Sequence, residues 1–304
     1  DNPVFDFDNR GKKSVVVDTS KPEGVEIVKK LIADADVFLT NVRPGGLERS
    51  GLDYESLKKL NPGLVYCTLT GYGLEGPDKD RPGFDIASFW SRAGLAKLFP
   101  PKGMDPFPLR TAFGDHVTSI AASSAINAAL VKKFRTGEGQ LVEASLLRTG
   151  LYTIGSDFAI QLFFDRIAST KSREETNPPI MNFFQTKDEK WICIVARQGN
   201  SDWPKICKAA GIPELADDER LTSGKGRRAH SKEIVRKLDD AFGGFDMDEL
   251  AERLDAEQIA WAPVQSLADV AADPQVYAAG GIVETPGHSG GTFKSPASPA
   301  RFPG

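Results

Sequence analysis

The sequence predicts an α/β fold, with a large domain built on a parallel sheet and a smaller α+β domain after it. Over residues 14–69, short β-branched or apolar runs alternate with segments whose apolar residues recur at helical spacing. Strand, helix, strand, helix, strand in that order implies parallel strands joined by right-handed crossovers. A polar, proline-terminated stretch at residues 166–180 then precedes a hairpin pattern. We therefore place a linker between two domains at 166–180.

In the first domain, predicted over residues 1–165, the elements follow one another closely. Residues 14–18 are a β-branched run and are predicted to be the first strand. Residues 22–33 are predicted to be a helix, with Ser20 as a candidate N-cap and Pro22 in the first turn. The next predicted elements are a strand at 36–40, one or two short helices over 46–59 and a strand at 64–69.

A long loop and a helix of small residues complete this domain. Residues 74–113 are rich in Gly, Pro and charged residues, so most of this segment is expected on the surface, with one short helix near 86–97. Residues 115–134 contain many Ala and Ser residues, which predicts a central, buried helix that other backbones approach closely. A strand at 141–144 and one apolar helix over 146–164 follow.

The smaller domain is predicted over residues 181–275. Residues 183–186 and 191–195 flank a charged turn, which is typical of a hairpin. The other predicted elements are helices over 203–210, 231–242 and 247–254, a strand at 260–264 and a short helix near 267–272. Residues 276–304 are expected to return toward the large domain.

The composition excludes several classes of protein. The 304 residues carry 38 Lys plus Arg and 42 Asp plus Glu, a formal charge of −4, which argues against nucleic-acid binding. No stretch reaches the roughly 18 apolar residues that a membrane helix needs, and no secretory signal is visible. The three cysteines include no Cys-x-x-Cys pair, and the three histidines are scattered. We expect a cytoplasmic protein without a metal and without a membrane or nucleic-acid partner.

A glycine motif follows the third predicted strand. Gly71, Gly73 and Gly76 have the spacing of the dinucleotide-binding fingerprint, Gly-x-Gly-x-x-Gly. Pro77 and more loop come next, so no helix N-terminus is present to hold a pyrophosphate. We interpret the motif as a glycine turn that ends a strand.

Two other segments carry charged residues in positions that suit a site. Arg43 and Arg49 come directly after the second predicted strand, at the carboxyl end of a parallel sheet, where anionic ligands bind in such folds. A solvated pair of arginines explains the same pattern equally well. Asp115 stands at the beginning of the small-residue helix, where a carboxylate either caps the helix or acts as a nucleophile or base. His116 is a poor partner for it, because adjacent helical residues do not face each other.

Polar pairs elsewhere have simpler interpretations. Glu174 and Glu175 lie in the linker and are expected to be solvated. The basic cluster at residues 225–228 is also expected to be solvated and is too small to bind nucleic acid.

Taken together and in order, several motifs resemble the family III CoA transferases, which include formyl-CoA and carnitine CoA transferases and the related α-methylacyl-CoA racemases. These motifs are residues 14–18 with 22–24, 35–45, 60–62, 71–77, 114–115 and 135–140. The resemblance implies a Rossmann-like large domain, a pair of identical subunits interlocked as rings, and a chain that is trimmed at both ends.

The same resemblance implies the chemistry. Asp115 is the nucleophile: its carboxylate attacks an acyl-CoA thioester to give an acyl-aspartyl anhydride and CoA thiolate. The thiolate then forms an aspartyl-CoA thioester, which hands CoA to an acceptor carboxylic acid. The ligands are therefore an acyl-CoA and a carboxylic acid, with coenzyme A as the transferred group and no metal. The residues that the resemblance assigns to CoA are Val17, Asp18, Thr19, Ser20, Asn41, Val42, Arg43, Arg49, Arg81, Phe84 and Asp85.

Two positions depart from the family pattern. Phe84 stands where the racemases have a His and formyl-CoA transferase has a Tyr; because Phe cannot titrate, transfer is favoured over racemisation. Residues 175–180 replace a glycine-rich flap, which disfavours formyl and oxalyl groups. Two alternatives stay open. One is a racemase that uses Asp115 with His116 or another base, and the other is a non-catalytic partner subunit of a heteromeric CoA transferase.

Overall fold

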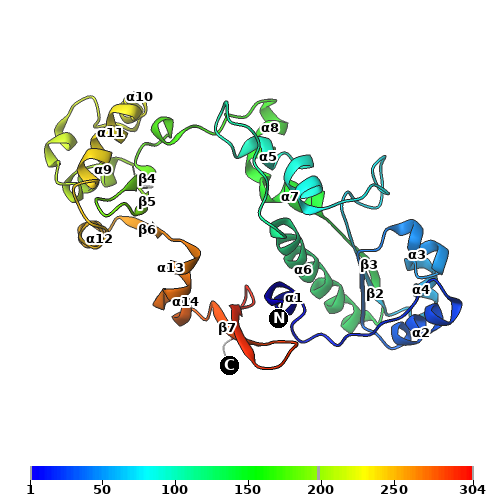
Figure 1. Cartoon of the computed structure of the whole chain (residues 1–304). Helices are drawn as coiled ribbons and strands as arrows, with labels where there is room; N and C mark the ends of the chain where they lie inside the picture. The colour runs from blue at the N-terminus through cyan, green and yellow to red at the C-terminus, as the bar shows by residue number, and fades with distance from the viewer. Residues whose placement is uncertain (1, 197–198, 303–304) are drawn as a thin grey trace. The chain divides into compact units, whose positions relative to one another are not determined.

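The computed structural model describes residues 2–196 and 199–302, and the chain divides into two compact units (Figure 1). One unit is Val15–Thr170; the other combines Asp1–Ser14 with Lys171–Gly304. The chain therefore passes from one unit to the other after Ser14 and again after Thr170. The boundaries of the predicted domains and linker stay predictions.

A parallel sheet forms the centre of the unit Val15–Thr170. Its three strands lie in the order β1 (Val37–Thr40), β2 (Val65–Thr70) and β3 (Gln140–Ser145), all parallel, as the alternation of strands and helices predicted. Tyr66 of β2 faces the helices that connect the strands, whereas its neighbour Cys67 faces the opposite side.

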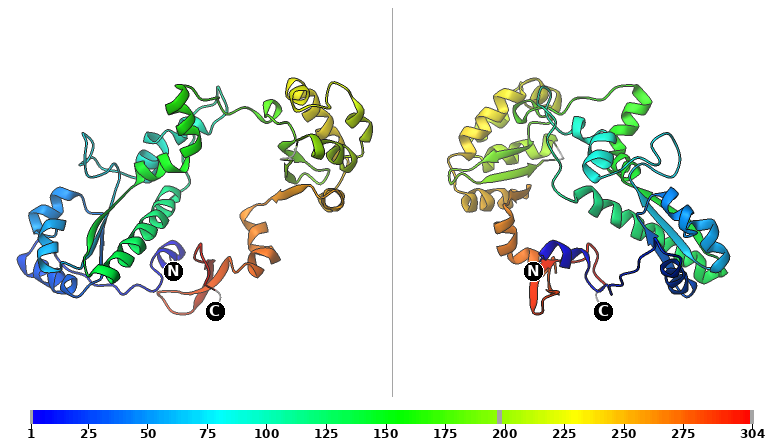
Figure 2. Two further views of the ribbon diagram at one scale, coloured as in Figure 1. Left: turned by 180° about the vertical axis from the view of Figure 1, so that it is seen from behind. Right: turned by 45° about the vertical axis from the view of Figure 1, so that its right-hand side comes forward.

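Helices cover both faces of this sheet (Figures 1 and 2). The first face packs against α2 (Pro22–Ala33), α3 (Pro44–Ser50) and α4 (Tyr54–Leu60) through Ile32, Leu47, Leu57 and Tyr66. The second face packs against the long helix α6 (Phe113–Thr136), whose Ala122 and Ala129 contact the β2 and β3 side chains. The small side chains let α6 approach the sheet closely, but Ile120 and Val131 on its other side are exposed. Helix α6 is thus buried on the face that packs against the sheet and exposed on the opposite face, so the prediction of a central, buried helix holds for one face.

The predicted strand at residues 14–18 is wrong. These residues form no strand, and Val16 is 97% exposed. A β-branched run becomes a strand only where a neighbouring strand accepts its backbone hydrogen bonds, and none lies beside it in the described part of the chain. Ser20 is not the N-cap of α2, which is Lys21; its hydroxyl instead donates to the Asp18 carboxylate at 2.6 Å. Pro22 does occupy the first turn, as predicted.

The glycine motif after β2 is a turn, as interpreted. Gly73 and Gly76 have positive φ, and the next helical segment begins only at Ile86. A Cβ on Gly71 would lie 2.7 Å from the Cα of Gly83, so this glycine lets two backbone segments cross. This crossing brings the loop back toward β2 before the next element begins.

That next element is η1 (Ile86–Arg92), a π-helical turn, followed by the short α5 (Leu95–Leu98). Both pack against α7 (Leu146–Thr153) in a cluster around Phe89 and Trp90. The single helix predicted over 146–164 is two helices, because the backbone leaves the helical region at Ile154 before α8 (Gly155–Phe164) begins. Helix α8 has no buried residue.

The centre of the other unit is an antiparallel sheet of β4 (Met181–Gln185), β5 (Trp191–Val195) and β6 (Ala260–Val264). The hairpin of β4 and β5 confirms the prediction. The helices of this part are α9 (Gly199–Ala209), α10 (Gly224–Ala229), α11 (Ser231–Phe242), α12 (Met247–Ala256) and the turns η2 (Arg173–Glu175) and η3 (Pro213–Asp217). Their core forms around Trp203, Phe184 and Leu238.

The predicted solvation of the basic cluster 225–228 is wrong for Arg227. This residue is 2% exposed, and its guanidinium donates to the carbonyl oxygen of Leu221 at 2.8 Å and to Oδ1 of Asn200 at 2.5 Å. It also lies over the Trp203 ring. The local sequence around Arg227 does not show this burial, because the residues that contact Arg227 come from other segments of the chain.

The end of the chain packs against its beginning. Helices α13 (Leu267–Ala272) and α14 (Pro274–Ala278) lead to a hairpin of β7 (Ile282–Pro286) and β8 (Thr292–Pro296), which was not predicted. Helix α1 (Pro3–Asp8) contacts this hairpin: the carboxylate of the buried Asp6 lies 2.9 Å from Nδ1 of His288. Arg10 donates to the carbonyl oxygen of Pro296 at 2.7 Å.

Candidate active site

Asp115 lies in the first turn of α6 with its side chain exposed. The helix begins after Ala112, whose φ of 60° is unusual for a residue with a side chain. Ala112 occupies the N-cap position, so Asp115 is the third residue of the helix. The Asp115 carboxylate lies at the N-terminal, positive end of the α6 dipole, where negative charge interacts favourably with the helix.

Gly114 brings the beginning of α6 against the beginning of η1. A Cβ on Gly114 would lie 2.7 Å from Cγ of Phe89 and 2.9 Å from Cβ of Asp85, closer than real side chains approach. The glycine therefore permits a contact that places Asp115 next to the segment of Phe84 and Asp85. The contact thus joins Gly114 to Asp85, and the predicted site residues Asp115 and Phe84 are their neighbours in the sequence.

Asp85 and Phe84 have different environments there. Oδ1 of Asp85 accepts a hydrogen bond from the N–H of Ile86 at 2.7 Å, whereas Oδ2 is buried and has no hydrogen-bond partner among the described residues. Phe84 is 71% exposed. A buried carboxylate oxygen without a partner suits a polar group supplied by a ligand or by water.

A cationic cavity of about 670 Å³ lies between α2 and α3. It gathers three of the residues assigned to CoA, namely Thr19, Ser20 and Arg49. Lys21 and Lys29, which the sequence reasoning missed, also line it, against the single carboxylate of Glu26. The signal for Lys29 was the helical spacing from Lys21 and Val25, which places these residues on one side of α2. Three cations against one carboxylate suit the phosphates of a nucleotide.

The predicted CoA contacts at residues 17–18 and 41–43 are close in sequence to residues that line this cavity, but they do not line it themselves. Gly24 permits residues 17–18 to lie against α2, because its missing Cβ would meet the carbonyl oxygen of Asp18. Hydrogen bonds from Ser20 hold the pKa of Asp18 below its usual range, so this carboxylate is ionised at neutral pH. Asn41, Val42 and Arg43 connect β1 to α3, with Arg43 as the N-cap. The carboxyl end of β1 thus carries these residues, as predicted.

Arg81 lies in the loop before Phe84. Its Nη1 is 3.6 Å from Oδ1 of Asp78, and Asp78 also binds Arg92 of η1 at 3.0 Å. Arg81 is therefore connected to the C-terminal end of η1 through a carboxylate that it shares with Arg92.

Across residues 2–196 and 199–302, no group of three or more His, Cys, Asp or Glu residues is placed to hold a metal ion. Within the same residues, no helix is both long and apolar enough to cross a membrane.

Comparison with known proteins decides the family. The family model described as CoA-transferase family III matches residues 1–304. The chain belongs to this family. It is therefore an enzyme of the CoA-transferase class, which confirms the resemblance seen in the sequence motifs.

Several family members of known activity are similar over most of the chain. The (R)-2-hydroxy-4-methylpentanoate CoA-transferase of Clostridioides difficile is 32% identical over 99% of this chain and 75% of its own length. The human succinyl-CoA:glutarate CoA-transferase is 30% identical over 97% of this chain and 66% of its own length. The chain therefore spans about two thirds to three quarters of these CoA-transferases.

Solved structures agree with the mixed α/β fold. A CAIB/BAIF family protein from Brucella suis matches with a TM-score of 0.83 and 31% identity, covering 97% of this chain and 76% of its own. The Mycobacterium tuberculosis protein Rv3272 matches with a TM-score of 0.85 and 26% identity, covering 97% and 78%.

Proposed function

We propose that this CoA-transferase moves CoA from an acyl-CoA to a carboxylic acid, with Asp115 as the nucleophile. The observation that carries the proposal is the exposed carboxylate in the first turn of α6, held by Gly114 beside Phe84 and Asp85. The similar CoA-transferases that act on 2-hydroxy-4-methylpentanoate, glutarate and phenyllactate also support acids as substrates.

In the proposed reaction, an Asp115 oxygen attacks the thioester carbonyl carbon and the C–S bond breaks, which gives an acyl-aspartyl anhydride and CoA thiolate. The thiolate attacks the aspartyl carbonyl and releases the acyl group as a free carboxylate. The acceptor carboxylate then attacks the aspartyl-CoA thioester, which expels the thiolate and leaves a second anhydride between the acceptor and Asp115. The thiolate attacks the acceptor's carbonyl carbon in this anhydride, which forms the new acyl-CoA and releases the Asp115 carboxylate. Because each leaving group is a thiolate or a carboxylate, no general acid is required.

The cationic cavity is the proposed site of the nucleotide end of CoA. Thr19, Ser20 and Arg49 line it, and Lys21 and Lys29 add positive charge for the phosphates. Val17, Asp18, Asn41, Val42, Arg43 and Arg81 are proposed as further CoA contacts on the strength of the family resemblance. The protein is also proposed to work as an interlocked homodimer in the cytoplasm.

Isotope labelling tests the proposal. The protein is incubated in D₂O with acyl-CoAs, each paired with succinate or another free acid, and the products are read by mass spectrometry. New CoA esters without α-deuterium are expected. Deuterium without a new ester would identify a racemase, and neither product would favour a non-catalytic subunit.

Substitution of the nucleophile provides the second test. Asp115→Asn is expected to lower the transfer rate on the order of 10³-fold or more, because an amide is a very poor nucleophile. Asp157→Asn is the matched control, since Asp157 is also an exposed acid in the first turn of a helix. Transfer by Asp115→Asn at the wild-type rate would exclude the proposed mechanism.

A further inference from the structure

A cavity of about 520 Å³, here called the α10–α11 cavity, lies in the unit that contains Lys171–Gly304. Its lining comes from Lys171, Glu175 and Asn177 on one segment and from residues 228–233 at the end of α10 and the beginning of α11. Its volume is in the usual range for small-molecule sites. The proposed transfer reaction gives none of these residues a role.

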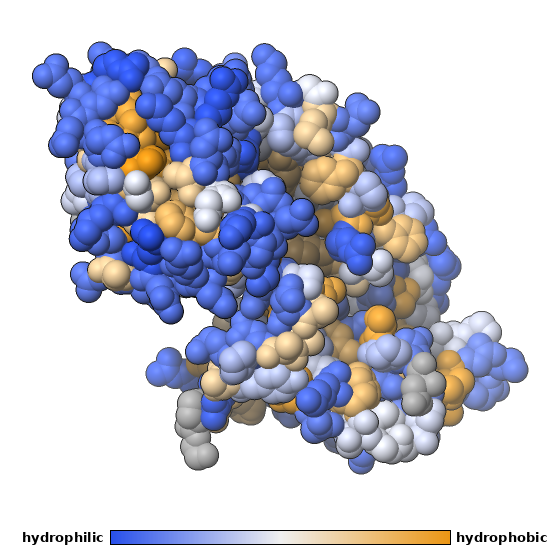
Figure 3. All heavy atoms as spheres, turned by 60° about the vertical axis from the view of Figure 1, so that its left-hand side comes forward, coloured by the Kyte–Doolittle hydropathy of each residue, from blue (hydrophilic) through white to orange (hydrophobic). Residues whose placement is uncertain are grey.

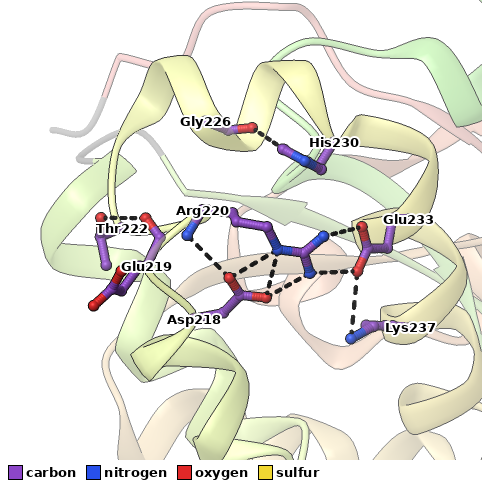
Figure 4. Close-up of polar contacts among 8 residues, drawn as sticks. All are labelled: Asp218, Glu219, Arg220, Thr222, Gly226, His230, Glu233 and Lys237. Atoms are coloured by element: carbon purple, nitrogen blue, oxygen red, sulfur yellow. Dashed lines mark hydrogen bonds and ion pairs between the residues drawn. The ribbon is translucent and has the colours of Figure 1, made fainter.

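The basic side chains of this cavity outnumber the acidic ones, and both acidic side chains already have a cationic partner. Its titratable members are Lys171, Arg228, His230, Lys232, Glu175 and Glu233. Oε1 of Glu175 lies 3.2 Å from Nζ of Lys232. Oε1 of Glu233 lies 3.0 Å from Nη2 of Arg220, which does not line the cavity (Figure 4). The two carboxylates therefore leave positive charge in the cavity unbalanced.

Three donor groups that line the cavity have no acceptor among the described residues. The side chains of Lys171 and Arg228 are exposed and make no hydrogen bond or ion pair there. Ser231 is 7% exposed, and its Oγ donates to Oδ1 of Asn177 at 2.8 Å. Because that oxygen is the acceptor, the NH₂ group of Asn177 is left to bind a ligand. An ammonium, a guanidinium and an amide thus offer hydrogen bonds to an anion.

His230 adds a group whose hydrogen position is fixed. Its Nδ1 lies 3.0 Å from the carbonyl oxygen of Gly226 (Figure 4). A carbonyl oxygen only accepts, so Nδ1 carries the hydrogen and Nε2 is the nitrogen available to a ligand. A neutral Nε2 accepts from a protonated oxygen of an anion, and a protonated Nε2 donates to an ionised one.

A phosphate group matches this set of donors. A phosphomonoester has a charge of about −1.5 to −2 at neutral pH and three strong acceptor oxygens, whereas a carboxylate has a single charge and two oxygens. Guanidinium and ammonium groups are the cations with which proteins bind phosphate. We propose that the α10–α11 cavity binds a phosphate group, as inorganic phosphate or as a phosphomonoester, through Lys171, Arg228 and Asn177.

Nuclear magnetic resonance gives a local test, because the chain has only three histidines. The ring resonances of His230, assigned by comparison with His230→Gln, are followed in the full chain as inorganic phosphate, glycerol 2-phosphate or succinate is added. A saturable shift with phosphate is expected, whereas the ring of His288, which does not line the cavity, should not shift. Tighter binding of glycerol 2-phosphate would identify a phosphomonoester as the ligand, and tighter binding of inorganic phosphate would identify the free ion.

Two variants make the result specific. Asn177→Asp keeps the shape of the side chain and the acceptor for Ser231 but replaces the NH₂ donor with a carboxylate oxygen, and Arg228→Gln removes the charge of an exposed residue. Each is expected to raise the dissociation constant for phosphate about tenfold or more, the range for a lost hydrogen bond to a charged group. Arg236→Gln, an exposed arginine of α11 outside the cavity, and Arg49→Gln, in the cationic cavity, should leave it unchanged.

Several results would overturn the proposal. His230 resonances that do not shift with phosphate, or that shift without saturation, would exclude a phosphate site in this cavity. Succinate bound as tightly as phosphate would show a general response to anions. Phosphate binding that is weakened in Arg49→Gln but not in Arg228→Gln would place the ion in the cationic cavity instead. Circular dichroism checks that each variant is folded.

Discussion

At the scale of single residues, a glycine determines where the candidate nucleophile lies. Gly114 has no side chain, and the space that a Cβ would occupy is filled by Phe89 and Asp85. The first turn of α6 therefore lies directly on η1, with Asp115 as the next residue. The position of the carboxylate thus depends on a packing contact that its own side chain does not make.

Gly114→Ala is expected to destabilise the protein by about 1–3 kcal/mol, the usual cost of overpacking, and to reduce transfer activity by moving the beginning of α6. Both effects share one physical reason, the 2.7 Å approach of the new Cβ to the Phe89 ring. Urea unfolding and the steady-state transfer rate measure them.

Gly155→Ala is the matched control for this substitution. Gly155 is also helical, at the beginning of α8, but nothing lies within 4 Å of the position of its Cβ. We expect this variant to be more stable than the wild type by up to about 1 kcal/mol, because alanine favours helix over glycine. Equal effects of the two substitutions would contradict the packing argument.

At the scale of elements, an arginine connects a loop to helix α11 within the unit that contains Lys171–Gly304. Arg220 lies between Asp218 and Glu233 of α11, and Lys237 approaches Glu233 from the next turn (Figure 4). Its Nη2 is 2.6 Å from Oδ2 of Asp218 and 3.0 Å from Oε1 of Glu233. Hydrogen bonds from Arg220 lower the pKa of Asp218 to about 2 and lower the pKa of Glu233 as well.

These lowered pKa values predict a pH-dependent stability. A carboxylate whose pKa is lower in the folded protein stabilises the fold above its unfolded pKa, near 4, and loses this effect as the pH falls through its folded pKa. Arg220→Gln should therefore lower the melting temperature at pH 7, and the difference from the wild type should shrink as the pH falls from about 4 to 2. Thermal unfolding followed by circular dichroism at each pH measures it.

Arg236→Gln on the same helix serves as the control, since Arg236 makes no ion pair in the described part of the chain. Its effect on the melting temperature should be small and independent of pH. A pH-independent deficit in Arg220→Gln would show that the arginine acts through packing and not through its carboxylate partners.

At the scale of the whole molecule, apolar side chains at the surface support the proposed homodimer. Figure 3 shows apolar residues reaching the surface of the chain, and on α8 Leu162 is 72% and Phe163 is 81% exposed. Successive large apolar residues on an exposed helix are typical of a surface that a partner covers. Nothing within the described chain buries a residue of α8.

We expect light scattering on a sizing column to give twice the 32.9 kDa of one chain. Phe163→Glu should raise the dissociation constant at least about tenfold, because a buried charge without a partner is strongly unfavourable at an interface. Leu267→Glu, at an 84% exposed position on α13, is the control and should leave the mass unchanged. A monomeric wild type at micromolar concentration would refute the dimer.

The sequence by itself determined the elements whose signals are local. The apolar spacing and Pro22 predicted α2 to the residue, and the patterns of α11, β6 and α13 were equally complete. The order of strands and helices determined the parallel sheet, and the Gly114-Asp115 motif identified the candidate nucleophile within a known family. In each case the information lies in neighbouring residues, whose propensities and spacing act over a few turns of the chain.

Only the tertiary structure decided the features that depend on distant partners. The β-branched residues 14–18 form no strand, the apolar segment after β3 breaks at Ile154, and Arg227 is buried. Lys29 and Arg49 line the same cavity, and the hydroxyl of Thr68 is buried without a hydrogen-bond partner in the described part of the chain. Strand pairing, burial and the clustering of charges depend on which segments contact one another in the folded chain. The local propensities of a sequence do not specify those contacts.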